Sequence, residues 1–227
     1  MNYTELRAII KSQISSSFPE ASENIRRSIF QLDQNSIVNL ITEIGTIPED
    51  IAHDSTEEKL YTKTSDILFA KALELMDFDV TVLRERADSA DIVARSKYHS
   101  YSLVGDAKAF RLSRTAKNAK DFKVDAMVHW KGSNDFAVLT CPYFQYPKTK
   151  SQIFKEALIG NVCLCSWEYL YVMLQENIKE KPNFSLKNLW NQSSIIGQST
   201  TVENIKNSFI VEKTVKLPPK KRRKLTP

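Results

Sequence analysis

The sequence is poor in cysteine and has no long hydrophobic run. Its three cysteines, Cys141, Cys163 and Cys165, are an odd number without a recognisable metal-binding spacing, which argues against a disulfide framework. The N-terminal residues lack the apolar region of a signal peptide, and no apolar stretch is long enough to span a bilayer. We therefore expect a protein of a reducing, cytoplasmic compartment with no membrane segment.

The net charge of +5 is unevenly distributed along the chain. Seven basic residues and no acidic ones lie from residue 213 onward, so residues 1–212 carry 25 basic and 27 acidic side chains. A local group of cations is more informative, and it consists of Lys108, Arg111, Arg114, Lys117, Lys120 and Lys123. Such a group can neutralise DNA phosphates, although a solvated helix or loop face is the simpler explanation for a charge run taken alone.

Apolar spacing predicts helices first and strands later. The first 45 residues and residues 55–76 have helical spacing, and Ser55-Thr-Glu-Glu58 is typical of a capping box. Three short apolar runs, at residues 80–83, 92–94 and 101–104, then predict neighbouring strands. The later expected elements are a helix at 115–130, a strand at 136–139, a helix at 151–158, a strand at 162–165 and a helix at 167–174. This order predicts an α/β fold in which helices flank a mixed β-sheet.

Two carboxylates and a lysine lie at the ends of adjacent predicted strands. Asp91 precedes one apolar run, and Asp106 and Lys108 follow the next. Side chains alternate faces along a strand, so an Asp-x-Lys spacing puts both charges on one side, and Asp91 joins them if the strands pair. Two carboxylates can hold Mg²⁺ for phosphodiester hydrolysis, with the lysine stabilising charge or orienting water. On spacing alone, a surface ion pair at a strand end is the simpler explanation.

Two assignments around this group stay open. Asp121 and Lys123 form a second Asp-x-Lys pair and compete with Lys108 as partners of Asp106. We prefer the earlier pair, because Asp121 and Lys123 fall in a helical pattern, where residues two apart do not face together. Glu58 is either an additional metal ligand or the capping-box partner of Ser55.

Several segments, in order from about residue 40 to 190, resemble the HindIII restriction endonuclease family. The clearest begins with Val104-Gly-Asp-Ala-Lys108 and continues to residue 118. The others are residues 55–60, 120–124, 137–140, 144–147, 149–155 and 166–168. The resemblance fades after about residue 190, where the family continues with a further helical region, so the chain looks shortened at its C-terminus.

The resemblance implies a PD-(D/E)xK nuclease core that acts as a homodimer on double-stranded DNA with Mg²⁺. It implies a bacterial type II restriction endonuclease that cuts within the palindromic site AAGCTT, alongside a cognate DNA methyltransferase. Asp91 matches the first acidic position of the motif, with Ala90 in place of proline. Asp106 matches the second acidic position, and Lys108 matches the lysine.

The same resemblance makes residues 113–118 the expected segment for base recognition. Arg114 suits guanine and Asn118 suits adenine, whereas the lysines are better placed for phosphates. The expected DNA-binding residues are Arg114, Lys117, Asn118, Lys120, Asp121 and Lys123.

We expect four regions along the chain. They are an N-terminal helical region at residues 1–50, the nuclease core at 51–190, an extension at 191–212 and a disordered basic tail at 213–227. Two other functions remain open: a catalytically impaired relative that binds DNA without cutting it, and a PD-(D/E)xK nuclease of another specificity.

Overall fold

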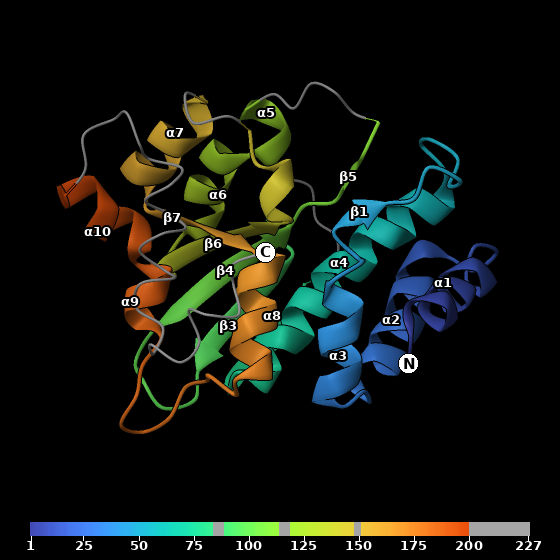
Figure 1. The fold of residues 1–227 in the computed structure, drawn as a ribbon, viewed down its shortest axis with the longest axis horizontal. Helices are drawn as coiled ribbons and strands as arrows, with labels where there is room; N and C mark the ends of the chain where they lie inside the picture. The colour runs from blue at the N-terminus through green and yellow to red at the C-terminus, as the bar shows by residue number, and fades with distance from the viewer. Residues whose placement is uncertain (84–88, 114–118, 148–150, 200–227) are drawn as a thin grey trace.

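A computed structural model describes residues 1–83, 89–113, 119–147 and 151–199 of this chain (Figure 1). A five-stranded β-sheet lies between two layers of helices, which confirms the predicted α/β fold with a mixed sheet. The predicted basic tail and the predicted recognition residues Arg114, Lys117 and Asn118 lie outside the described residues.

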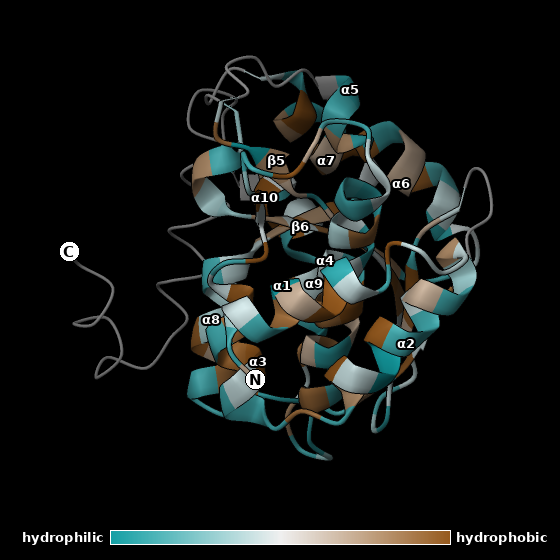
Figure 2. Cartoon of the chain, turned by 90° about the vertical axis from the view of Figure 1, so that its right-hand side faces the viewer, coloured by the Kyte–Doolittle hydropathy of each residue, from teal (hydrophilic) through white to brown (hydrophobic). Residues whose placement is uncertain are grey.

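Three N-terminal helices come first, as the apolar spacing predicted. They are α1 (Tyr3–Ser12), α2 (Phe18–Phe30) and α3 (Gln34–Ile41). Asn2 and Asp33 cap the N-termini of α1 and α3 by accepting backbone hydrogen bonds. Hydrophilic and hydrophobic residues alternate along α2 in Figure 2, as expected for a helix with one exposed and one buried side.

Helix α4 (Thr56–Leu75) lies between these helices and the sheet, and all its residues from Lys63 to Leu73 are buried. Ser55 caps it by accepting a hydrogen bond from the backbone N–H of Glu58 at 3.1 Å. The other half of the predicted capping box differs, because the Glu58 carboxylate accepts from the backbone N–H of Asp54. A helix covered on both sides cannot place its charged residues in water, so each needs an internal partner.

The main sheet has the strand order β2-β3-β4-β6-β7. The first three strands are antiparallel neighbours and the last three run parallel, so the three strands predicted to be neighbours do pair. The strands are β2 (Phe78–Val82), β3 (Ile92–Ser96), β4 (Ser102–Ala107), β6 (Phe136–Cys141) and β7 (Val162–Ser166). A separate parallel pair joins β1 (Thr46–Ile47) to β5 (Phe110–Arg111).

The helices cover the sheet from both sides. Together with α1 to α4, α8 (Trp167–Gln175) and α9 (Lys187–Trp190) contribute to the hydrophobic core on one side. The core on the other side includes residues of α5 (Ala119–Phe122), α6 (Val124–Lys131), α7 (Gln152–Gly160) and α10 (Gln192–Ser199). A short 3₁₀ helix, η1 (Tyr143–Gln145), lies within the proline-containing loop after β6. In the part of the chain that the structure describes, no helix is both long and apolar enough to cross a membrane.

One predicted helix is divided. The sequence pattern predicted a single helix over residues 115–130, but α5 ends at Phe122 and α6 starts at Val124. Lys123 between them has a φ of 51°, in the left-handed region, which interrupts the right-handed helix. The buried apolar residues of α5 and α6 still face one core, which explains why their spacing looked continuous.

Candidate active site

Three aspartates meet at the end of the sheet where β3 begins and β4 ends. Asp91 directly precedes β3, Asp106 lies in β4, and Asp66 lies in the middle of α4. The antiparallel register places Ile92 opposite Gly105, which brings Asp91 next to Asp106 as predicted for paired strands. One carboxylate oxygen from each aspartate lies within 4.8 Å of the others. We call Asp66, Asp91 and Asp106 the three-carboxylate group.

Asp66 was not predicted from the sequence. Its side chain is 6% exposed, and its Oδ1 accepts a hydrogen bond from the backbone N–H of Ala107 at 2.9 Å. This bond ties the middle of α4 to the strand that carries Asp106. An available signal was the position of Asp66 in Ser65-Asp66-Ile67-Leu68, where a charged residue interrupts the apolar part of a helix.

Asp106 and Lys108 lie on the same side of the chain, as their spacing predicted. Lys108 Nζ lies 2.5 Å from Asp106 Oδ2, and both side chains are largely buried. The backbone N–H of Lys108 donates to the Thr140 carbonyl at 2.7 Å, so hydrogen bonding to β6 continues past the end of β4. The lysine is thereby held at this end of the sheet beside the three carboxylates.

The neighbouring positive charge does not fully offset the burial of these carboxylates. Burial raises the pKa of Asp66 well above its ordinary value, and the nearby carboxylates of Asp91 and Asp106 raise it further. Burial also raises the pKa of Asp106, and the neighbouring Lys108 offsets only part of that rise. For Lys108, burial lowers the pKa, but the attraction of Asp106 outweighs it and the pKa lies above its ordinary value. An additional cation would therefore be favoured at this place.

A second lysine also reaches the group. Lys63, one helical turn before Asp66 on α4, donates from Nζ to Asp91 Oδ1 at 2.6 Å. Its side chain is 7% exposed. Lys63 was not predicted from the sequence either, because a lysine in a helical pattern ordinarily lies on the solvated face.

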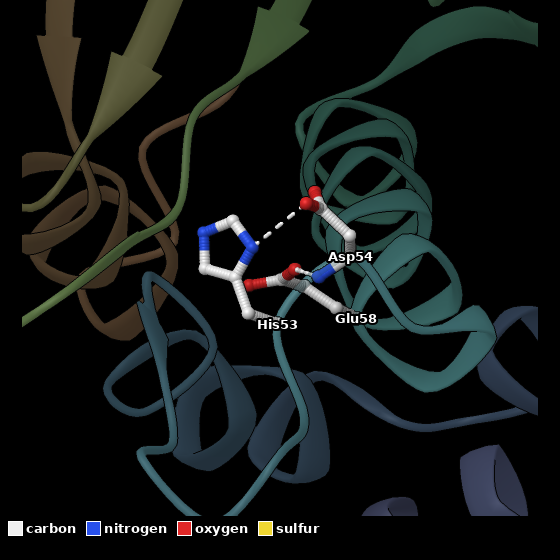
Figure 3. A group of neighbouring side chains, drawn as sticks. All are labelled: His53, Asp54 and Glu58. Atoms are coloured by element: carbon white, nitrogen blue, oxygen red, sulfur yellow. Dashed lines mark hydrogen bonds and ion pairs between the residues drawn. The ribbon is translucent and has the colours of Figure 1, made fainter.

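Glu58 lies in a different group of side chains, with His53 and Asp54 (Figure 3). His53 Nδ1 lies 3.0 Å from Asp54 Oδ2, and the Asp54 backbone N–H donates to Glu58 Oε2 at 2.7 Å. Arg111 donates to Glu58 Oε1 from Nε at 3.0 Å and from Nη2 at 2.7 Å. The structure therefore connects Glu58 with β5 and does not bring it into the three-carboxylate group.

The expected DNA-binding residues that the structure describes lie on α5 and just after it. Lys120 and Asp121 are in α5, and Lys123 follows with its Nζ 5.6 Å from the centre of the Trp130 ring. Among the described residues, the groups of carboxylates able to share a metal include Asp106 but not Asp121. This arrangement favours Asp106 with Lys108 over the alternative pair Asp121 and Lys123.

Comparison with known proteins identifies a matching family model and a similar relative. A sequence model of the HindIII restriction endonuclease family matches residues 6–214. The type II restriction enzyme HindIII of Haemophilus influenzae (strain ATCC 51907 / DSM 11121 / KW20 / Rd) is 44% identical over 206 residues. The aligned region covers 91% of this chain and 69% of that enzyme. The three-carboxylate group and Lys108 lie inside the range matched by the family model.

Proposed function

This chain belongs to the HindIII restriction endonuclease family, and we propose that it hydrolyses phosphodiester bonds of double-stranded DNA within the palindromic site AAGCTT. Family membership confirms the resemblance found in the sequence and makes the chain a type II restriction enzyme. The site AAGCTT and the need for Mg²⁺ are parts of the proposal, because only the resemblance implies them.

The observation that carries the proposal is the three-carboxylate group beside Lys108. Its side chains come from α4, from the residue before β3 and from β4, so the fold itself assembles them. Carboxylate oxygens are the hard ligands that Mg²⁺ prefers, and oxygens around one Mg²⁺ lie at most about 4.2 Å apart. The three oxygens lie within 4.8 Å of one another, close to the spacing that one Mg²⁺ requires.

The carboxylates and the lysine of the site have different tasks in this proposal. Asp66, Asp91 and Asp106 hold the metal, which when bound stabilises negative charge on the phosphate as a Lewis acid. Lys108 is fixed by Asp106 and by the hydrogen bond of its backbone to Thr140, so its ammonium points to one place. From there it orients the attacking water or stabilises the charge that develops on the phosphate.

The proposal also includes the DNA contacts, the dimer and the methyltransferase expected from the sequence. Arg114 and Asn118 contact bases, while Lys117, Lys120 and Lys123 contact phosphates and Asp121 lies in the same segment. A palindromic site calls for two copies of the chain related by a two-fold axis, and therefore for a homodimer. A cognate methyltransferase protects the DNA of the bacterial host, in whose cytoplasm the enzyme acts.

The first experiment is digestion of a plasmid with mapped AAGCTT sites by the purified chain, with Mg²⁺ and with EDTA. Fragments that end at those sites, formed only with Mg²⁺, would support the proposal in full. Fragments that end at other fixed sites would indicate a nuclease of another specificity. A gel shift on AAGCTT DNA without cleavage would indicate a relative that binds without cutting.

Asp106→Asn tests the chemistry separately from DNA binding. The substitution removes one carboxylate from the metal site and the ionic partner of Lys108, while the side-chain shape is kept. We expect cleavage to fall by about 100-fold or more, which corresponds to about 2.7 kcal/mol or more of lost stabilisation. Gel shifts in Ca²⁺ should still show binding to AAGCTT DNA, and unchanged cleavage would rule out Asp106 as a metal ligand.

A further inference from the structure

We propose that Lys63 is a positioning residue, which holds the Asp91 carboxylate in the orientation that lets it join Asp66 and Asp106 around a metal ion. This inference rests on the proposed function. It concerns a residue that lies beside the three-carboxylate group and contacts one of its members directly.

Each member of the three-carboxylate group has its own hydrogen-bond donor or ionic partner. Asp66 accepts from the backbone N–H of Ala107, and Asp106 pairs with Lys108. Among the described residues, Lys63 is the donor to the Asp91 carboxylate, at 2.6 Å. Asp91 is also the most exposed of the three, with 30% of its side chain accessible, so the surrounding core restrains it least.

Lys63 itself is held in place from two sides. It belongs to the buried part of α4, and its Nζ lies 3.4 Å from the Leu83 carbonyl as well as 2.6 Å from Asp91. The backbone N–H of Leu83 in turn donates to the Asp91 carbonyl at 2.8 Å. The lysine thus links α4 to both chain segments that approach the site from β2 and β3. A buried donor fixed in this way orients a carboxylate better than a solvated one does.

A positioning role and a charge-balancing role of Lys63 predict opposite changes in cation binding when the lysine is removed. If the lysine only balances negative charge, its removal leaves the site more negative and strengthens cation binding. If the lysine orients Asp91, its removal frees that carboxylate to rotate, and cation binding weakens. Loss of a residue that supports a metal ligand typically weakens metal binding by about 10- to 100-fold.

Lys63→Met is the test, because methionine keeps an unbranched apolar side chain and loses the ammonium. Lys71→Met is the matched control, since Lys71 is also buried on α4 and binds the Phe30 carbonyl and Glu74, away from the carboxylates. Binding of Mn²⁺ to the full chain without DNA is followed by the loss of the free-ion signal in electron paramagnetic resonance. Mn²⁺ is a suitable probe because it takes the same oxygen ligands as Mg²⁺.

We expect Lys63→Met to bind Mn²⁺ about 10- to 100-fold more weakly than the wild type, and Lys71→Met to bind within about twofold of it. Cleavage by Lys63→Met should then recover in part as the Mg²⁺ concentration is raised. If Lys63→Met does not fold, Lys63→Leu, which also lacks a hydrogen-bond donor, is measured in the same way and should also bind Mn²⁺ more weakly.

Three results would overturn the inference. Equal or tighter Mn²⁺ binding by the Lys63 variant would leave the lysine with a charge-balancing role only. Equal weakening in Lys63→Met and Lys71→Met would point to general damage to α4. A wild-type chain that binds no Mn²⁺ would remove the proposed metal site, and the role of Lys63 with it.

Discussion

Replacing Asp66 by asparagine is expected to stabilise the metal-free protein and to abolish DNA cleavage. Asparagine has nearly the same shape, and its Oδ1 can keep the hydrogen bond from the Ala107 backbone N–H. The substitution removes a carboxyl group whose charged form is disfavoured by burial and by the nearby Asp91 and Asp106. Enzymes commonly lose stability at such sites in exchange for function, so the two effects should have opposite signs.

The size of the stability change follows from this relief of repulsion. Single substitutions that remove a destabilising feature typically raise the free energy of unfolding by about 0.5–2 kcal/mol. For a chain of this length, each kcal/mol raises the Tm by about 2–4 °C. We therefore expect the Tm of Asp66→Asn in EDTA to exceed that of the wild type by about 1–8 °C.

The effect should also depend on pH. The pKa of Asp66 is raised in the folded protein, so the folded state keeps this proton to higher pH than the unfolded chain does. In EDTA, the Asp66 contribution to wild-type stability therefore falls as the pH rises from the ordinary pKa of 3.8 through the raised value. Asp66→Asn lacks this contribution, so its advantage should grow over the same pH range.

Thermal unfolding in EDTA and in Mg²⁺, together with plasmid digestion, measures all of these effects. Asp135→Asn is the control, because Asp135 accepts a hydrogen bond from the Ser102 backbone N–H at the opposite end of β4. Its substitution should leave cleavage unchanged. Cleavage by Asp66→Asn at the wild-type rate would refute the metal role of Asp66, and a lower Tm in EDTA would refute the repulsion.

Two further substitutions test the surroundings of the site. Glu58→Gln weakens the contact with Arg111 and should lower the free energy of unfolding by about 1–3 kcal/mol. The Mg²⁺ dependence of cleavage should stay as in the wild type. A large rise in the Mg²⁺ concentration needed for cleavage would instead make Glu58 a metal ligand. Gly105→Ala places a Cβ 2.8 Å from the Phe69 ring, which should lower the free energy of unfolding by about 1–3 kcal/mol. Chemical denaturation measures this change, and an unchanged denaturant midpoint would show that the ring moves easily.

Local spacing predicted that Asp106 and Lys108 share one side and that Asp91 joins them if the strands pair, whereas the family resemblance favoured this group over a surface ion pair. Strand alternation puts residues 106 and 108 on one side, and short apolar runs separated by a turn favour antiparallel pairing. In the structure, the register of β3 and β4 brings Asp91 next to Asp106. The alternating order of helices and strands gave the fold class in the same way.

Asp66 and Lys63 could not be found by the same means. Helical spacing indicates which residues share a side of α4, but not that helices cover one side and the sheet the other. A charged residue on such a helix is expected in water until both neighbours are known. The break at Lys123 was hidden for a related reason, since α5 and α6 contribute to one core despite the left-handed residue between them.

The buried charged residues of α4 fall into two kinds according to their partners. Lys71 is satisfied by the Phe30 carbonyl and by Glu74, so its contacts account for its burial. Lys63 and Asp66 instead face carboxylates from two other elements, and burial disfavours the charged form of Asp66. A sequence selected only for stability would replace such a group with apolar residues. Its presence at this end of the sheet, beside Lys108, is therefore the physical reason to seek the catalytic function there.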